Sequence, residues 1–189
     1  SSSGQGNSDV LDGGAGADIL QVSSGSHVFA SDLNFSNIET VLTDASGSSI
    51  NLSAQTEGFT ITGGAGIDTL TGGAGVNVIT GDAGNDIITG GASDDIITGG
   101  AGDDIITGGS SNDIFNIDSG EDTVNDLTTG DVFVVSAGAT LNAINVTNFI
   151  ANSSSKNEHA TGTAKLTAKA STTSVIKMNN AGAGKYNLV

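Results

Sequence analysis

GDAGNDIITGGASDDIITGGAGDDIITGG, residues 81–109, repeats nearly the same nine residues three times. Each copy places an aspartate, two isoleucines and a threonine after a glycine-rich segment. With the frame set at Gly63, seven consecutive nonapeptides run to Asn125, and an earlier pair occupies residues 4–12 and 13–21. Self-similarity at a short fixed period is the signature of a repeat architecture, in which each unit packs on its neighbours.

Each unit divides into a turn and a short strand. The first six residues are turn material, because paired glycines adopt the positive φ angles that other residues resist. The last three are β-prone, and their alternation puts position eight on one face and positions seven and nine on the other. Eighteen residues therefore return the chain to the same edge of the stack. We predict a core built from position eight: Leu11, Leu20, Leu70, Ile79, Ile88, Ile97, Ile106, Phe115 and Val124.

The repeats resemble a known family. GGAGADILQ (13–21), GGAGIDTLT (63–71) and GGAGDDIIT (99–107) match the G-G-x-G-x-D-x-U-x nonapeptide of the RTX (repeats-in-toxin) calcium-binding family. The resemblance covers residues 4–21 and 63–125, somewhat under half of the chain. It implies an all-β fold, a parallel β-roll or β-solenoid, with calcium held between stacked turns.

The resemblance also implies the ligands, which are the position-six side chains and the backbone carbonyls of the turns. The position-six residues are Asp9, Asp18, Asp68, Asn77, Asp86, Asp95, Asp104, Asp113 and Asp122. The expected carbonyls belong to Gly63, Ala65, Gly72, Ala74, Gly81, Ala83, Gly90, Ala92, Gly99, Ala101, Gly108 and Ser110.

Stacking makes the acidic turns dependent on a cation. Turns two units apart lie ~4.8 Å apart, the spacing of strands in a sheet. Two carboxylates at that distance repel by about 3–4 kcal/mol at an effective dielectric of ~20. Calcium suits such gaps, because it takes six to eight oxygen ligands in irregular geometry, whereas magnesium demands a tight octahedron. The residues can also be read more simply, since Asp and Asn favour turns without any metal.

Neighbours two units apart give five gaps in residues 63–125: 68/86, 77/95, 86/104, 95/113 and 104/122. We expect the 77/95 gap to bind calcium most weakly, because Asn77 supplies an amide in place of a carboxylate. The 104/122 gap is also doubtful, because Ile117 and Asp118 replace the opening glycines. Further sites involving Asp9 and Asp18 would need residues 22–62, or residues upstream of Ser1, to complete them.

The charge distribution separates two parts of the chain and excludes several partners. Residues 1–155 contain 20 acidic and no basic residues, whereas 156–189 contain five lysines and Glu158. So acidic a stretch repels nucleic acid and anionic membranes and attracts cations. No run is apolar enough to predict a transmembrane segment. Catalysis has little support, because cysteine is absent, both histidines lie outside the repeats and no nucleophile motif occurs.

We expect four regions. Residues 1–21 are the repeat pair that ends an upstream array, 22–62 a β-rich spacer that continues the solenoid, 63–125 the main roll, and 126–189 a β-rich capping or assembly module. The strands expected outside the repeats are 38–43, 48–53, 58–62, 131–136, 143–150, 164–170 and 173–178.

The expected function is that of a calcium-binding structural module of a secreted or cell-surface bacterial protein, of surface-layer or adhesin type. The resemblance implies type I secretion and folding in calcium-rich surroundings outside the cell. The alternative is a C-terminal secretion and folding appendage of a secreted hydrolase or toxin. Outward residues at position seven, such as Ile87 and Ile96, either serve β-propensity and cross-strand pairing or mediate self-association with other modules.

Overall fold

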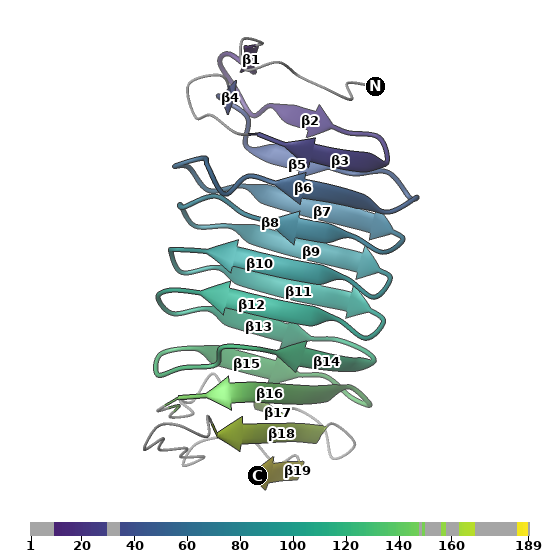
Figure 1. Ribbon diagram of the computed structural model, residues 1–189, viewed down its shortest axis with the longest axis vertical. Helices are drawn as coiled ribbons and strands as arrows, with labels where there is room; N and C mark the ends of the chain where they lie inside the picture. Colours follow the sequence, from purple (N-terminus) through teal and green to yellow (C-terminus); the bar gives the residue numbers. More distant parts are fainter. Residues whose placement is uncertain are drawn as a thin grey trace.

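The chain folds into a stack of β-coils. The computed structural model describes residues 10–29, 35–147, 149, 156–157, 163–168 and 185–188. Two sheets of parallel strands run along the long axis, and the strands from β5 to β18 alternate between them (Figure 1). This is the parallel β-roll expected from the nine-residue phase. The described residues contain no helix that could cross a membrane.

Sheet one has nine strands among the described residues, in the spatial order β19-β18-β16-β14-β12-β10-β8-β6-β3. In chain order they are β3 (Gly25–Val28), β6 (Ser48–Asn51), β8 (Thr69–Thr71), β10 (Ile87–Gly91), β12 (Ile105–Gly109), β14 (Glu121–Val124), β16 (Thr140–Val146), β18 (Thr163–Ala168) and β19 (Lys185–Leu188).

Sheet two has eight strands in the described part, ordered β17-β15-β13-β11-β9-β7-β5-β2. They are β2 (Ile19–Gln21), β5 (Thr40–Leu42), β7 (Thr60–Ala65), β9 (Val78–Ala83), β11 (Ile96–Ala101), β13 (Ile114–Ile117), β15 (Val132–Val135) and β17 (Lys156–Asn157). A short parallel pair, β1 (Leu11–Asp12) and β4 (Phe35–Ser36), lies at the N-terminal end.

The strands stack in the predicted eighteen-residue register. Ile87 pairs with Ile105 in sheet one, and Ile96 pairs with Ile114 in sheet two. Several strands are longer than the three residues expected, because the following turn continues the ladder: Gly100 still pairs with Asp82. The backbone reaches this geometry with positive φ at position two, 108° at Gly100 and 73° at Asp82.

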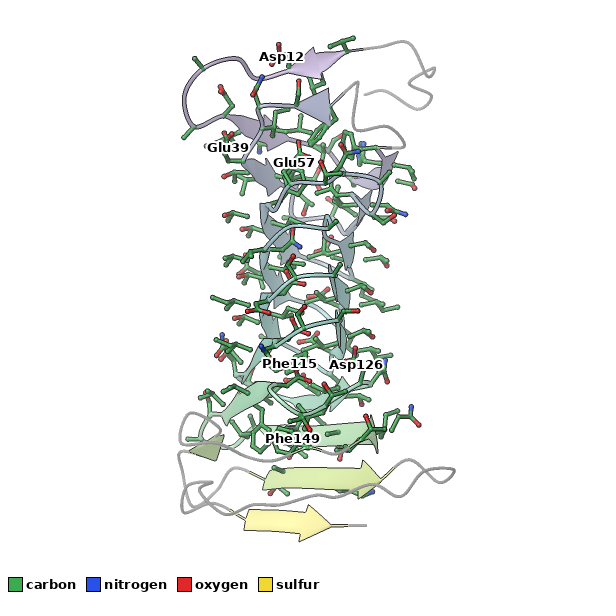
Figure 2. All side chains as sticks on the ribbon, turned by 90° about the vertical axis from the view of Figure 1, so that its left-hand side faces the viewer. Asp12, Glu39, Glu57, Phe115, Asp126 and Phe149 are labelled. Carbon is green, nitrogen blue, oxygen red and sulfur yellow. The ribbon has the colours of Figure 1, made fainter. Side chains whose placement is uncertain are left out.

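Position eight forms the core, as predicted, throughout the main roll. Its side chains from Leu70 to Val124 are fully buried, and Phe115 lies between the two sheets in Figure 2. The position-eight residues of the early pair, Leu11 and Leu20, are only partly buried against this core. One side chain per nine residues makes a thin core, so each coil depends on its neighbours above and below.

The solenoid extends on both sides of the repeats. Strands expected at 38–43, 48–53 and 58–62 are β5, β6 and β7, which join the two sheets in continuous register. Beyond the repeats, β15 stacks on β13 and β16 on β14. The two sheets therefore continue past residue 125 without a break. The division between the main roll and a capping or assembly module at 126–189 stays a prediction. The strand expected at 173–178 lies outside the described residues.

Candidate metal centre

Position six forms two ladders of buried polar side chains, one on each edge of the roll. We call the turns leading into sheet one the first edge and those leading into sheet two the second edge. The first edge carries Asp68, Asp86, Asp104 and Asp122, and the second carries Asn77, Asp95 and Asp113, as the register predicts. Each of these side chains is at most 1% exposed. Burial of so many carboxylates requires compensation, because ionised groups lose their hydration.

One carboxylate oxygen of each aspartate has a backbone partner. Oδ1 of Asp68 accepts the N–H of Ser48 at 2.6 Å. In the following units Oδ1 accepts the N–H of the position-six residue two units earlier, so that Asp86 accepts from Asp68 and Asp104 accepts from Asp86, both at 2.8 Å. Asp113 accepts from Asp95 at 2.9 Å in the same way on the second edge. This bond fixes the side chain and ties stacked turns together, and it uses only half of the carboxylate.

The second carboxylate oxygen is buried and has no hydrogen-bond partner. This holds for Oδ2 of Asp68, Asp86, Asp95, Asp104 and Asp122. At Gly63, the place that a Cβ would occupy lies 2.7 Å from Oδ2 of Asp68 and 2.6 Å from the carbonyl oxygen of Gly81. The glycine leaves open a cradle on which a carboxylate oxygen and a carbonyl oxygen converge. Hard oxygen donors without protons are the ligands that calcium takes, so these residues fit the ion.

Burial also raises the pKa of the ladder carboxyls. Desolvation is the largest cause for Asp68, Asp86, Asp95 and Asp104, and neighbouring carboxylates add to the rise. For Asp113 and Asp122, burial raises the pKa to about 7. A charged ladder is therefore costly at neutral pH unless a positive charge compensates it.

Carboxylates alone do not make a complete site. Among the described residues, no three His, Cys, Asp or Glu side chains gather where they could hold a metal ion. The expectation that backbone carbonyls supply the remaining ligands stays a prediction. Of those expected, the carbonyls of Gly81 and Gly99 at position one face the cradles, whereas those of Ala83 and Ala101 at position three accept N–H groups of stacked turns.

A comparison with protein families agrees with this geometry. The model of the RTX calcium-binding nonapeptide repeat matches in four copies, over residues 3–26, 60–88 and 89–124. These segments are RTX calcium-binding repeats. RTX nonapeptides bind calcium, so the chain contains a calcium-binding structural module. Comparisons with curated proteins and with solved structures found no match.

An eighth RTX-like unit, beyond the seven predicted from the sequence, follows the seventh without a break. Residues 126–134, DLTTGDVFV, place Asp131 at position six, and its Oδ1 accepts the N–H of Asp113 at 2.9 Å. Asp131 is 2% exposed. Its Oδ2 accepts the N–H and hydroxyl of Thr128, at 2.7 and 3.2 Å. The signal was present in the spacing 113, 122, 131, and the missing paired glycines hid it.

The 104/122 gap has the same geometry as its neighbours despite the altered turn. Oδ1 of Asp122 accepts the N–H of Asp104 at 3.0 Å. The cradle at each position-one glycine lies between the aspartate of its own unit and the next turn on the same edge. For the unit that contains Asp122, the next stacked residue is Leu141. Ile117 therefore replaces a glycine only where the following turn offers no carboxylate.

The early RTX pair has a partner in the spacer. Asp18 stacks on Glu39, whose Oε2 accepts the Asp18 N–H at 2.8 Å, and Figure 2 shows Glu39 near the N-terminal end of the stack. Oδ2 of Asp18 is buried without a partner. The spacer thus supplies a carboxylate, that of Glu39, to stack on Asp18. The two residues are 21 positions apart in the sequence, whereas stacked residues of the main roll are 18 apart. Asp9 lies outside the described residues.

Proposed function

We propose that this chain is the calcium-binding structural module of a secreted or cell-surface bacterial protein, of surface-layer or adhesin type, and that it folds as it binds extracellular calcium. The observation that carries the proposal is the row of buried, unpartnered carboxylate oxygens of Asp68, Asp86, Asp104 and Asp122 along the first edge, with that of Asp95 on the second. A folded roll without cations would retain these desolvated charges next to one another. Folding and metal binding are then one equilibrium.

The proposed sites lie between stacked acidic turns. Five pairs of carboxylates are stacked in the main roll and the eighth unit: 68/86, 86/104, 104/122, 95/113 and 113/131. The paired aspartates, with the turn carbonyls beside them, would hold the ion. Bound calcium supplies the positive charge that offsets about 3–4 kcal/mol of repulsion per pair.

Calcium-dependent folding also suits export. RTX repeat proteins are typically secreted, and a chain that stays unfolded in calcium-poor cytoplasm could pass a narrow secretion channel. Outside the cell, calcium would then drive folding. In this proposal the module is structural and not catalytic.

Self-association is proposed for the outer faces. Val78 and Ile96 of sheet two and Ile87 and Ile105 of sheet one are between 37% and 46% exposed, in register on their sheets. Packing against other modules of the same protein would cover these apolar rows. Replacing Ile87, Ile96 and Ile105 with threonine should abolish association in calcium, measured by sedimentation, and spare calcium binding. Association that survives the change would remove this part of the proposal.

Calcium titration tests the main proposal. In excess chelator, the far-ultraviolet circular dichroism spectrum of the full chain should be that of a largely unfolded protein. Millimolar calcium should produce the β spectrum, whereas equal magnesium should not, because magnesium demands a tight octahedron and gives up its waters reluctantly. A full β spectrum in chelator would contradict coupled folding.

A further inference from the structure

The position-six residue Asn77 makes contacts that none of the aspartates can make. Its Nδ2 donates to the carbonyl oxygens of Gly75, Gly73 and Gly90, at 2.8, 3.1 and 3.3 Å. The same nitrogen lies 3.0 Å from Oδ1 of Asp95, the next position-six residue on this edge. Four oxygens from two stacked turns therefore surround one nitrogen.

The orientation of this amide follows from the chemistry of its neighbours. Oδ1 of Asn77 accepts the N–H groups of Phe59 and Gly73, at 3.0 and 3.2 Å. If the amide were turned over, its oxygen would face four acceptor oxygens and its NH₂ would face two N–H donors. Every contact would then be unfavourable, so the nitrogen must point into the gap.

The gap that receives this nitrogen corresponds to the ones that stay open beside the aspartates. At Gly72, the place that a Cβ would occupy lies 2.7 Å from Nδ2 of Asn77, where the equivalent place at Gly63 lies 2.7 Å from the unpartnered Oδ2 of Asp68. Asn77 is fully buried. The Asn77 amide therefore presents N–H donors to the oxygens of its gap. In the equivalent gaps, the aspartates present an unpartnered carboxylate oxygen.

We infer that the Asn77 amide takes the place of a calcium ion, so that the 77/95 gap closes permanently and binds no metal. The inference rests on the proposed function for the neighbouring gaps. The gap is more than a weak site, because the amide nitrogen already occupies the place between the four oxygens where a cation would lie. The contacts also indicate which carbonyls face a gap: positions two and four of one turn and position one of the next.

The consequence is a boundary between two halves of the solenoid. Two units before Asn77 on this edge, Phe59 occupies the stacked position and buries an aromatic ring, 2% exposed. Between Phe59 and Asp95, the second edge therefore holds no calcium. The first ion proposed on this edge lies between Asp95 and Asp113. The closed gap joins a metal-independent coil to the acidic coils and offers them a preformed surface on which to stack.

Two reciprocal substitutions in the full chain test the inference. Asn77→Asp replaces the donor with a carboxylate oxygen and should add one bound calcium per chain, measured by equilibrium dialysis with radioactive calcium. It should also lower the midpoint of any residual thermal unfolding in chelator. Asp86→Asn keeps the oxygen that accepts the Asp68 N–H and transplants the amide into the 86/104 gap. It should remove at least the calcium of the 86/104 gap, which receives the amide nitrogen, and raise stability in chelator.

Asn77→Ala separates the two effects of the first change. It removes the donor without adding a carboxylate, so it should lose stability in chelator and gain no calcium. Unchanged stoichiometry in Asn77→Asp together with unchanged stoichiometry in Asp86→Asn would overturn the inference, even if one variant folded poorly. A wild-type chain that bound no calcium would instead overturn the proposed function.

Discussion

Ile96 and Ile97 are adjacent, identical residues of β11 with opposite environments, and they offer a test of how the thin core supports calcium binding. Ile97 is fully buried between Ile79 and Phe115 of the neighbouring coils, whereas Ile96 is 37% exposed on the outer face. Ile97→Ala removes three carbons, about 2.4 kcal/mol of transfer free energy, and the cavity raises the loss to about 3–4 kcal/mol. Ile96→Ala should cost about 0.5–1 kcal/mol.

Coupled folding converts these losses into calcium requirements. If about five ions bind as the roll folds, a loss of ~3.5 kcal/mol is ~0.7 kcal/mol per ion and raises the calcium midpoint about threefold. Ile96→Ala should raise it by less than about 1.5-fold by the same relation. Circular dichroism during calcium titration measures both midpoints. Equal shifts for the two variants would refute the assignment of position eight to the core, and no shift for Ile97→Ala would refute coupling between core packing and binding.

Three further outcomes are expected. Asp82 has a φ of 73°, so Asp82→Gly should stabilise the roll by about 1 kcal/mol in urea unfolding with calcium present, and a loss of stability would contradict the strain. Asp131→Ala should remove one calcium per chain in equilibrium dialysis, because Asp131 completes the 113/131 gap, and an unchanged count would exclude that gap. Burial raises the pKa of Asp113 and Asp122 from 3.8 to about 7, so in chelator their protonation stabilises the folded state fully below about pH 4, and this stability is lost as pH rises through 7. The β signal of the calcium-free chain in circular dichroism should therefore be larger at pH 5 than at pH 8, and the opposite order would contradict the raised pKa values.

The period of the sequence predicts most of this architecture. A nine-residue phase determines which residues stack, so the register, the buried position eight and the two position-six ladders follow from counting along the chain. Asp86 at position six and Ile88 at position eight are two residues apart, and the equivalent residues of the other units lie in the equivalent places. The contacts can be predicted in this way because every unit repeats the same pattern and so predicts the same contact again.

The sequence predicts less where the period is irregular or where hydrogen-bond direction matters. Glu39 stacks on Asp18 across 21 residues, and no fixed period finds that pairing. Asp131 keeps the phase but lacks paired glycines, so glycine spacing alone misses it. Asn77 was expected to give the weakest calcium gap, and the hydrogen bonds that place its nitrogen among four oxygens do not follow from the sequence.

The ends of the acidic ladders explain why the array stops where it does. An unpartnered buried carboxylate oxygen is tolerable only if the next turn helps to hold a cation, so the last member of each ladder needs another solution. On the second edge, Thr128 donates twice to Oδ2 of Asp131, so this oxygen needs no ion beyond the 113/131 gap. On the first edge, Ile117 replaces the glycine beside Asp122, and the next stacked residue is Leu141. Asp122 keeps an unpartnered oxygen, and burial raises its pKa to about 7, so the charge at this end of the ladder depends on the ion proposed in the 104/122 gap.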